Sequence, residues 1–277
     1  MASNIKQLLK SKLTKKEISI LPTSFDVVGN ILIFSDFPSG LSKKSKIIGN
    51  IILKNFKNVK SVFKKTGKYS GKYRTPKLSL LVGVKNKETI HKENNSRLKL
   101  NVEKVYFSSR LSSERKRIFS QVKKNESILV MFSGVGVYPV VIARNSDAKE
   151  IYGVEVNPVA HKYALENVRL NKVEDRIKLF LGDVKKELPK INKKFNRVLM
   201  PLPKGAEGFL SIVLGKAKKG GIIHLYTFGK EEDYNSIKEV IKKELKKHKK
   251  KCKILRVVKC GQFSPRVFRL CVDFKVY

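Results

Sequence analysis

A glycine-containing turn is the first feature of this chain that is suited to chemistry. In S-I-L-V-M-F-S-G-V-G-V-Y-P, Gly134 and Gly136 lie where a strand-like apolar run ends and a helix-like run begins. Glycine at such a turn allows a ligand to approach the backbone N–H groups of a helix N-terminus. Because the pattern lacks the third glycine of a dinucleotide fingerprint, an ordinary strand-to-helix turn explains it about equally well.

Acidic residues at the ends of the next two strand-like runs make this turn more informative. Glu155 follows Gly136 by 19 residues in I-Y-G-V-E-V-N-P, a position from which a carboxylate can accept both hydroxyls of a ribose. Asp183 ends the third run in L-G-D-V, where it is placed to accept from an adenine amino group, and M-P-L-P-K ends the fourth. Each acid alone is more often a capping or surface residue. Together, at the carboxyl ends of strands, the four features predict an S-adenosylmethionine pocket.

Strand-like and helix-like segments that would position these residues alternate from residue 112 onward. The sequence S-S-E-R-K-R-I-F-S-Q-V begins with a capping-type serine and predicts a helix. The predicted segments that follow are strand 127–132, helix 137–145, strand 151–155, helix 158–170, strands 177–181 and 197–200, helix 205–218, strand 222–228, helix 233–247 and two closing strands. The alternation predicts a parallel sheet with right-handed crossovers, and the turn at G-Q-F-S-P predicts an antiparallel hairpin at one sheet edge.

The first part of the chain has a different pattern. Residues 1–19 have apolar residues at helical spacing and predict one short basic helix, whereas residues 47–56 fit either a helix or a strand. Most of the remaining segments up to residue 111 are strand-like and punctuated by glycine. We therefore expect a basic N-terminal segment (1–19), a small α+β domain (20–111) and a Rossmann-like α/β domain (112–277).

The charge of the chain is strongly positive. Among 277 residues, 61 are Lys or Arg and 23 are Asp or Glu, which gives a net charge of +38. A lysine bias of the genome explains part of this excess. The stretch 37–87, however, has 14 basic residues and no acidic one, which favours a phosphate-binding face. The cluster at 242–253, with eight lysines on a helical pattern, is more typical of a solvated helix face and its exit.

Composition excludes several classes of protein. An apolar fraction of 41% is too high for a disordered chain, and three cysteines do not make a disulfide framework. No apolar run approaches the ~18 residues of a membrane span, and the N-terminus lacks the features of a secretory signal. The spacing of Cys and His supports no zinc site. These observations predict a soluble, intracellular protein without a bound metal.

Many ordered stretches of the chain resemble the archaeal and eukaryotic tRNA (guanine(37)-N(1))-methyltransferase family. They include L-P-T-S-F-D-V-V-G-N, K-T-G-K-Y-S-G-K-Y-R, V-Y-F-S-S-R-L-S-S-E-R, M-F-S-G-V-G, V-E-V-N-P, L-G-D-V and L-P-K-G-A. The resemblance implies a class I S-adenosylmethionine-dependent methyltransferase domain behind a smaller RNA-facing domain. It also implies a cytoplasmic enzyme that binds the anticodon stem-loop of tRNA, with no membrane partner, and we expect a monomer.

The resemblance assigns roles to individual residues. The catalytic arginine of the family falls on Arg74, its general-base glutamate on Glu114 and its catalytic-site asparagine on Pro201, while Glu155 matches the ribose-binding acid. Tyr106 and Asp183 match cofactor-pocket positions. The full set expected at the cofactor is Tyr106, Phe132, Gly134, Gly136, Glu155, Val156, Asp183 and Val184.

The implied reaction requires these residue types. Guanine N1 carries a proton, so it cannot attack a sulfonium methyl group until a base such as Glu114 removes that proton. Negative charge then accumulates on the neighbouring O6, where a guanidinium such as that of Arg74 stabilises it. Without the resemblance, Glu114 would be a first-turn helix acid favoured by the helix dipole, and Arg74 one basic residue among fourteen.

Two departures from the family pattern change what is expected. Proline at position 201 cannot donate a hydrogen bond, and an archaeal subgroup with proline here also methylates a carbon of the tricyclic wyosine intermediate at the same nucleotide; a neutral replacement or a weaker guanine activity is the alternative. The extra N-terminal domain of the family has no counterpart in the sequence, so recognition should depend more on the basic face. An aminocarboxypropyl transferase and a non-catalytic RNA-binding protein are the competing functions.

Overall fold

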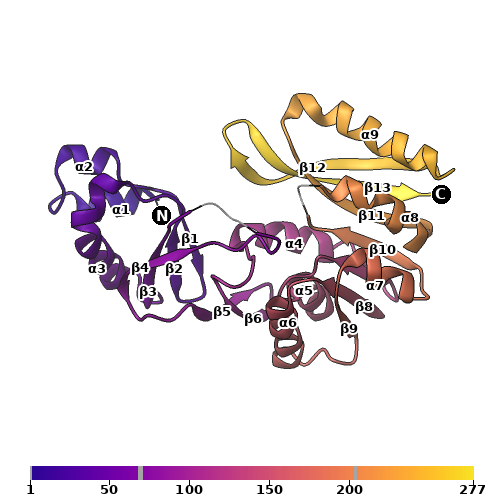
Figure 1. The fold of residues 1–277 in the computed structure, drawn as a ribbon, viewed down its shortest axis with the longest axis horizontal. Helices are drawn as coiled ribbons and strands as arrows, with labels where there is room; N and C mark the ends of the chain where they lie inside the picture. Colours follow the sequence, from indigo (N-terminus) through magenta and orange to yellow (C-terminus); the bar gives the residue numbers. More distant parts are fainter. Residues whose placement is uncertain (1, 68–70, 203–204) are drawn as a thin grey trace. The chain divides into compact units, whose positions relative to one another are not determined.

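The structure is a computed structural model that describes residues 2–67, 71–202 and 205–277. The chain divides into two compact units (Figure 1). The N-terminal unit comprises the residues up to Lys92 together with Arg97–Ser109, and the C-terminal unit comprises Glu93–Ser96 together with Arg110–Tyr277. Each unit is described by itself.

A four-stranded sheet forms the centre of the N-terminal unit. Its strands are β1 (Phe25–Val28), β2 (Ile31–Phe34), β3 (Ser61–Lys65) and β4 (Leu78–Gly83), in the spatial order β1-β2-β3-β4. Only the β2–β3 pair is parallel. The segment between these two strands contains the 3₁₀ helix η1 (Ser39–Lys44) and α3 (Ser45–Asn55), so the ambiguous stretch 47–56 is mainly helical. Apolar residues of α3 and β2 share one buried core.

The predicted single helix over residues 1–19 is instead two helices, α1 (Ala2–Leu9) and α2 (Lys15–Ser19). The break occurs because Thr14 caps the second helix. Its hydroxyl accepts the N–H of Glu17 at 3.2 Å, and the Glu17 carboxylate accepts the N–H of Thr14 at 2.7 Å. Ile5 and Leu9 of α1 are buried in the same core as the sheet.

The C-terminal unit has the predicted α/β fold. Its seven-stranded sheet has the order β12-β13-β11-β10-β7-β8-β9, in which β11, β10, β7, β8 and β9 are parallel and the hairpin β12–β13 is antiparallel at one edge. The strands are β7 (Ser127–Met131), β8 (Glu150–Glu155), β9 (Ile177–Leu181), β10 (Phe195–Met200), β11 (Ala217–Gly229), β12 (Cys252–Ser264) and β13 (Val267–Val276).

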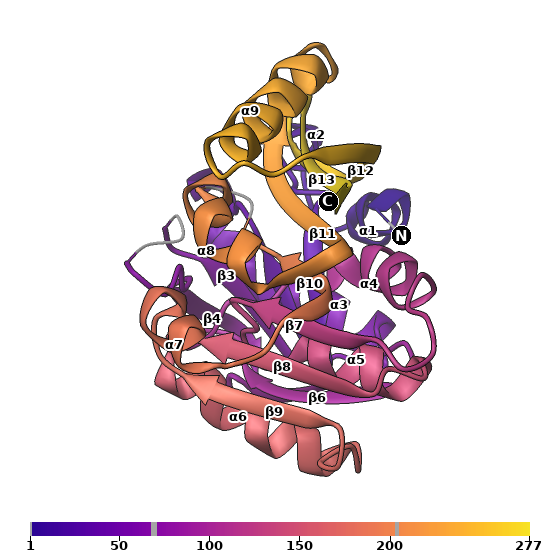
Figure 2. The same cartoon turned by 90° about the vertical axis from the view of Figure 1, so that its right-hand side faces the viewer.

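Helices cover both faces of this sheet (Figure 2). One layer contains α4 (Ser112–Phe119), α5 (Val137–Asn145) and α6 (Pro158–Leu170), and the other contains α7 (Val184–Lys190), α8 (Leu210–Lys216) and α9 (Tyr234–Lys247). The periodicity of the sequence does not predict α7, a short helix capped by Asp183. The predicted helix 205–218 is shorter than expected and follows the 3₁₀ helix η3 (Ala206–Phe209), because Ala217 already pairs with Phe195 as the first residue of β11.

A short hairpin contributes its turn to the C-terminal unit. The strands β5 (Glu88–Glu93) and β6 (Ser96–Asn101) are joined by Asn94 and Asn95, which both have positive φ. Glu93, at the end of β5, forms a buried ion pair with Arg115 of α4, in which both side chains are almost fully buried. The turn is therefore part of the core around α4. Among the helices that the structure describes, none has the length and hydropathy to cross a bilayer.

Candidate cofactor and catalytic site

The glycine turn after β7 has the geometry of a ligand-binding turn. Gly134 and Gly136 have φ of 57° and 77°, and the non-glycine residue Phe132 also has a positive φ of 54°. Gly136 caps α5, where a Cβ atom would lie 3.1 Å from the Cβ of Ala164 in α6. Conformation and close packing both require glycine at position 136.

Glu155, the last residue of β8, is fixed by backbone N–H donors. Gly134 N–H donates to its Oε2 at 2.7 Å, and Asn157 N–H donates to its Oε1 at 2.8 Å. A carboxylate has about four acceptor sites, so it can still accept a ribose hydroxyl beside its backbone donors. Burial raises the pKa of Glu155, and the backbone N–H groups of Asn157, Gly134 and Val156 oppose this effect without cancelling it. The predicted carboxylate and the predicted turn therefore meet directly.

Three further residues expected at the cofactor lie at the carboxyl edge, the edge of the sheet where the parallel strands end. Asp183 caps α7 by accepting the N–H of Lys185 at 2.8 Å, so the capping role considered from sequence is realised there. Val156, next to Glu155, is half-buried. Val184 is buried in the core, so a contact with the cofactor would fall to its backbone.

Pro201 follows the last residue of β10. Leu202 N–H donates to Met200 C=O at 2.7 Å, which makes Pro201 the central residue of a tight γ-type turn. Met200 pairs with Leu225, so Pro201 and Tyr226 are the next residues along two neighbouring parallel strands. The motif L-P-K-G-A continues through Pro203 and Lys204, which lie outside the described residues.

Phe209, which sequence reasoning missed, packs against the glycine turn. Its ring meets that of Phe132 edge to face at 5.0 Å between centroids, and Lys185 Nζ lies 5.3 Å from its centroid. A phenylalanine in an ordinary apolar pattern carries no signal that its ring packs against this turn.

Glu114 is buried in the first turn of α4, with 4% of its surface exposed. Arg117 donates to both carboxylate oxygens at 2.7 Å, and the hydroxyl of Tyr226 donates to Oε1 at 2.7 Å. The Tyr226 hydroxyl also lies 2.9 Å from that of Tyr138. The predicted base is thus held by the guanidinium of Arg117 and the hydroxyl of Tyr226. Tyr226 follows Leu225, and Pro201 follows Met200, the residue that pairs with Leu225 in the sheet.

The buried network extends from Arg117 to the other end of the sheet. Arg117 also donates to Asp273, whose carboxylate lies 2.6 Å from Nδ1 of His224. Arg197 Nη1 lies 2.7 Å from Nε2 of His224. Because arginine only donates, Nε2 accepts and the Nδ1–H of neutral His224 donates to Asp273. Burial raises the pKa of Asp273, but the bonds from His224 and Arg117 outweigh it and hold that pKa below its ordinary value, whereas burial lowers the pKa of His224.

His224, Cys271 and Asp273 have their potential ligand atoms within 4.8 Å of one another. The donor set does not fit a cation. Asp273 already pairs with Arg117 and Arg256, and His224 accepts from Arg197, so three guanidinium groups occupy the surroundings of the cluster. This is a structural charge network rather than a metal centre.

Two predicted site residues, Arg74 and Tyr106, belong to the N-terminal unit. Arg74 is half-buried and has a φ of 50°, in a turn closed by its N–H bonding to Gly71 C=O at 3.1 Å. A left-handed backbone is uncommon for arginine, and such strained positions cluster at functional sites. Tyr106 is 37% exposed. Residues 68–70 of the K-T-G-K-Y-S-G-K-Y-R motif lie outside the described residues.

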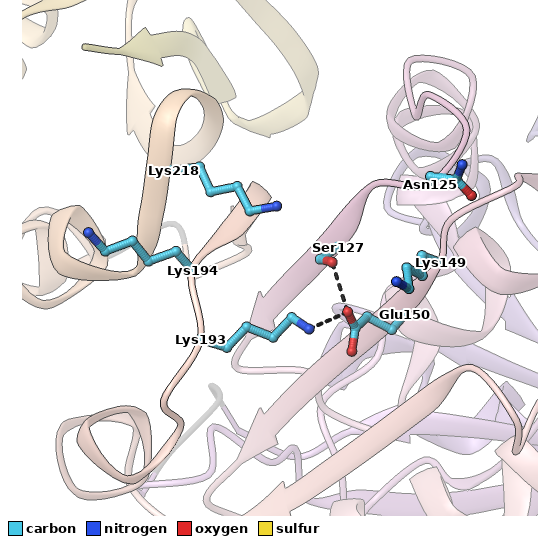
Figure 3. Close-up of a pocket in the computed structure, with 7 residues that line it drawn as sticks. All are labelled: Asn125, Ser127, Lys149, Glu150, Lys193, Lys194 and Lys218. Atoms are coloured by element: carbon cyan, nitrogen blue, oxygen red, sulfur yellow. Dashed lines mark hydrogen bonds and ion pairs between the residues drawn. The ribbon is translucent and has the colours of Figure 1, made fainter.

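A pocket of about 540 Å³ opens at the opposite, amino end of the strands (Figure 3). Glu150 lies at its centre and is bound by Lys193 and by the hydroxyl of Ser127, the latter at 2.8 Å. The lining residues are Asn125, Ser127, Lys149, Glu150, Lys193, Lys194 and Lys218. Because ligands of open α/β sheets bind at the carboxyl ends of the strands, this pocket is not the cofactor site.

Comparisons with known proteins agree with this geometry. Residues 89–255 match the family described as "TRM5/TYW2 methyltransferase domain", and residues 5–87 match "TYW2 N-terminal domain". The tRNA (guanine(37)-N(1))-methyltransferase Trm5b of Pyrococcus abyssi is 40% identical over 92% of this chain and 76% of its own length. The tRNA (guanine(37)-N(1))/4-demethylwyosine(37)-methyltransferase Taw22 of Nanoarchaeum equitans is 36% identical over 79% of this chain and 88% of its own.

Solved structures give the same result. The complex of aTrm5 with tRNALeu superposes with a TM-score of 0.86 at 34% identity, covering 99% of this chain and 78% of that one. Trm5 of Methanocaldococcus jannaschii in complex with adenosine superposes with a TM-score of 0.82 at 33% identity, covering 98% and 78%. The chain therefore belongs to the TRM5/TYW2 methyltransferase family.

Proposed function

We propose that this protein transfers a methyl group from S-adenosylmethionine to N1 of guanosine 37 in tRNA. The observation that carries the proposal is the hydrogen bond between Gly134 N–H and Glu155 at the end of β8, which supports a role of this carboxylate in accepting a ribose hydroxyl. A relative named as a tRNA (guanine(37)-N(1))-methyltransferase is 40% identical, and a family member has been solved with adenosine, which supports the cofactor. The bound cofactor supplies an electrophilic methyl group.

Glu114 is the proposed base that removes the N1 proton. Its two oxygens are occupied by Arg117 and Tyr226, so to receive a proton it must use a remaining lone pair or exchange one of these partners. The bond from Tyr226 fixes the carboxylate, and Tyr226 itself is the residue after Leu225, which pairs with Met200 just before Pro201. Arg74 is the proposed donor to O6, where negative charge develops as the proton leaves.

Pro201 supports a second activity, methylation of the tricyclic 4-demethylwyosine at the same nucleotide. The turn at Pro201 presents a pyrrolidine ring where the family has an asparagine amide, which leaves more room for a third ring and one donor fewer for guanine. The name of the Nanoarchaeum equitans relative includes both activities. We infer that this chain is bifunctional.

We further propose that the enzyme is cytoplasmic, acts as a monomer and contacts the anticodon stem-loop through the basic stretch 37–87. A related structure solved as a complex with tRNA supports the partner. The 14 basic residues of this stretch, without an acid, provide the charge that phosphates require.

One experiment tests both activities. The protein is incubated with S-adenosylmethionine and either unmodified tRNA or tRNA carrying the tricyclic intermediate, and the nucleosides are analysed by mass spectrometry. We expect a gain of one methyl group on each. Methylation of guanosine alone would exclude the bifunctional role, a mass gain of an aminocarboxypropyl group would indicate the alternative transferase, and no product on either tRNA would contradict the proposal.

Substitution of the two catalytic candidates tests the mechanism. Glu114→Gln and Arg74→Ala should each reduce single-turnover methyl transfer by roughly 10²-fold or more, because each removes a group that acts in the transition state. The affinity for S-adenosylmethionine should stay near the wild-type value in both. Full activity of either variant would remove that residue from the mechanism.

A further inference from the structure

The tip of the β12–β13 hairpin carries an unusually exposed aromatic side chain. Phe263 has 64% of its surface exposed, and its ring lies 4.2 Å from that of Phe228 in β11, at an interplanar angle of 35°. The guanidinium carbon of Arg269 in β13 lies 5.7 Å from the centroid of Phe228. We call Phe228 and Phe263 the aromatic platform.

The register places this platform beyond the carboxyl edge of the sheet, on the side where β10 ends just before Pro201. β11 continues four residues past Leu225, the partner of Met200, so Phe228 projects beyond the end of β10. Phe228 and Tyr226 are two residues apart and share one face of the strand, at a separation of about 7 Å. Because Tyr226 binds Glu114, the platform lies on the same face as the proposed base.

The charges around the platform favour an anionic ligand with flat rings. Arg269 and the exposed Arg266 lie in the hairpin. The neighbouring acids Glu231 and Glu232 are paired with Lys259 and Lys230. Proteins read unstacked RNA bases by combining aromatic faces with cations that contact the backbone.

We propose that the aromatic platform stacks a base of the anticodon loop that neighbours the target nucleotide. The proposal depends on the proposed function for the identity of the RNA. Enzymes that act on a base draw it out of its stack into the active site, which leaves the neighbouring base without a stacking partner. The neighbouring base, which has lost its stacking partner, stacks instead on the exposed ring of Phe263. This stacking fixes the loop so that the target base stays near Glu114.

The first test replaces the exposed ring. Phe263→Ala should raise KM for tRNA by about 5- to 150-fold, the range for loss of one base–aromatic stack, while Phe263→Trp stays near wild type. Tyr277→Ala is the matched control, because Tyr277 is 44% exposed, has Lys275 Nζ 5.5 Å from its ring centroid, and lies at the amino end of the sheet. The control and the affinity for S-adenosylmethionine should not change.

The second test uses stem-loop substrates in which position 36 or 38 is abasic. If Phe263 stacks one of these bases, Phe263→Ala should have little further effect on the substrate that lacks it and its full effect on the other. An equal penalty on all substrates, or no penalty on any, would refute the platform. Either result, with a wild-type enzyme that methylates the intact stem-loop, leaves the proposed function standing, whereas an inactive wild type would contradict that function itself.

Discussion

Glu155→Gln is the substitution for which the structure gives the sharpest expectation. The carboxylate accepts one backbone N–H on each oxygen, from Gly134 and from Asn157. A glutamine at this position keeps one acceptor and turns an amide N–H₂ toward the other backbone donor. One charge-assisted bond to the turn is lost, and so is one bond from a ribose hydroxyl, each worth about 1.5–3 kcal/mol. Loss of the ribose bond alone should weaken S-adenosylmethionine binding by about 10- to 150-fold.

Isothermal titration with S-adenosylmethionine measures this change, and a thermal melt of each variant measures the loss at the turn. Glu150→Gln is the matched control, because Glu150 lies at the other end of the same strand and binds Lys193 and Ser127 instead. The control should bind the cofactor as the wild type does. An affinity of Glu155→Gln within twofold of wild type would refute the assignment of Glu155 to the ribose.

Three further predictions concern the charge network and the surface. Burial lowers the pKa of His224, so below about pH 6.5 the unfolded chain binds a proton that the folded chain does not. The free energy of unfolding should therefore fall as the pH falls through that value, by at most about 1.4 kcal/mol per pH unit. In urea unfolding, His224→Gln should show a weaker dependence of stability on pH, and an unchanged dependence would exclude this residue as the cause. Arg117→Met leaves Glu114 and Asp273 buried without their shared cation and should cost about 3–5 kcal/mol of unfolding free energy; a loss below about 1 kcal/mol by the same method would contradict the network. With 6–10 phosphate contacts, tRNA affinity should fall about 10³- to 10⁵-fold between about 50 and 200 mM salt, and a flat response in filter binding would show that the charge is compositional.

The features that the sequence predicts well depend on local order along the chain. Gly134, Glu155 and Asp183 could be placed because each follows a strand of an alternating pattern, and such strands end at one edge. The network of Arg197, His224 and Asp273 could not be found in this way. Its members come from three strands, and each looks like an isolated polar residue in an apolar run until the sheet brings them together.

Competition between elements explains the remaining differences. The helical pattern extends to residue 218, yet the helix ends at Lys216 because strand pairing begins at Ala217. The turn beside Phe263 is predicted at G-Q-F-S-P, but the contact of its ring with Phe228 depends on how far β11 extends beyond its neighbour, which the residues around Phe263 do not indicate. Its partner Phe228 is 35 positions away in the sequence.

The ion pair between Glu93 and Arg115 limits where the chain can be cut or recombined with a relative without loss of folding. Arg115 lies in α4, but its carboxylate partner comes from a hairpin that precedes it by 22 residues. A fragment that starts at residue 110 would contain the whole seven-stranded sheet and still leave a guanidinium buried without its counter-charge. A recombination point before β5 keeps the pair together, and the family match beginning at residue 89 includes both partners. A transferable module therefore begins with the hairpin, and chimaeras between relatives joined there should fold where those joined at residue 110 do not.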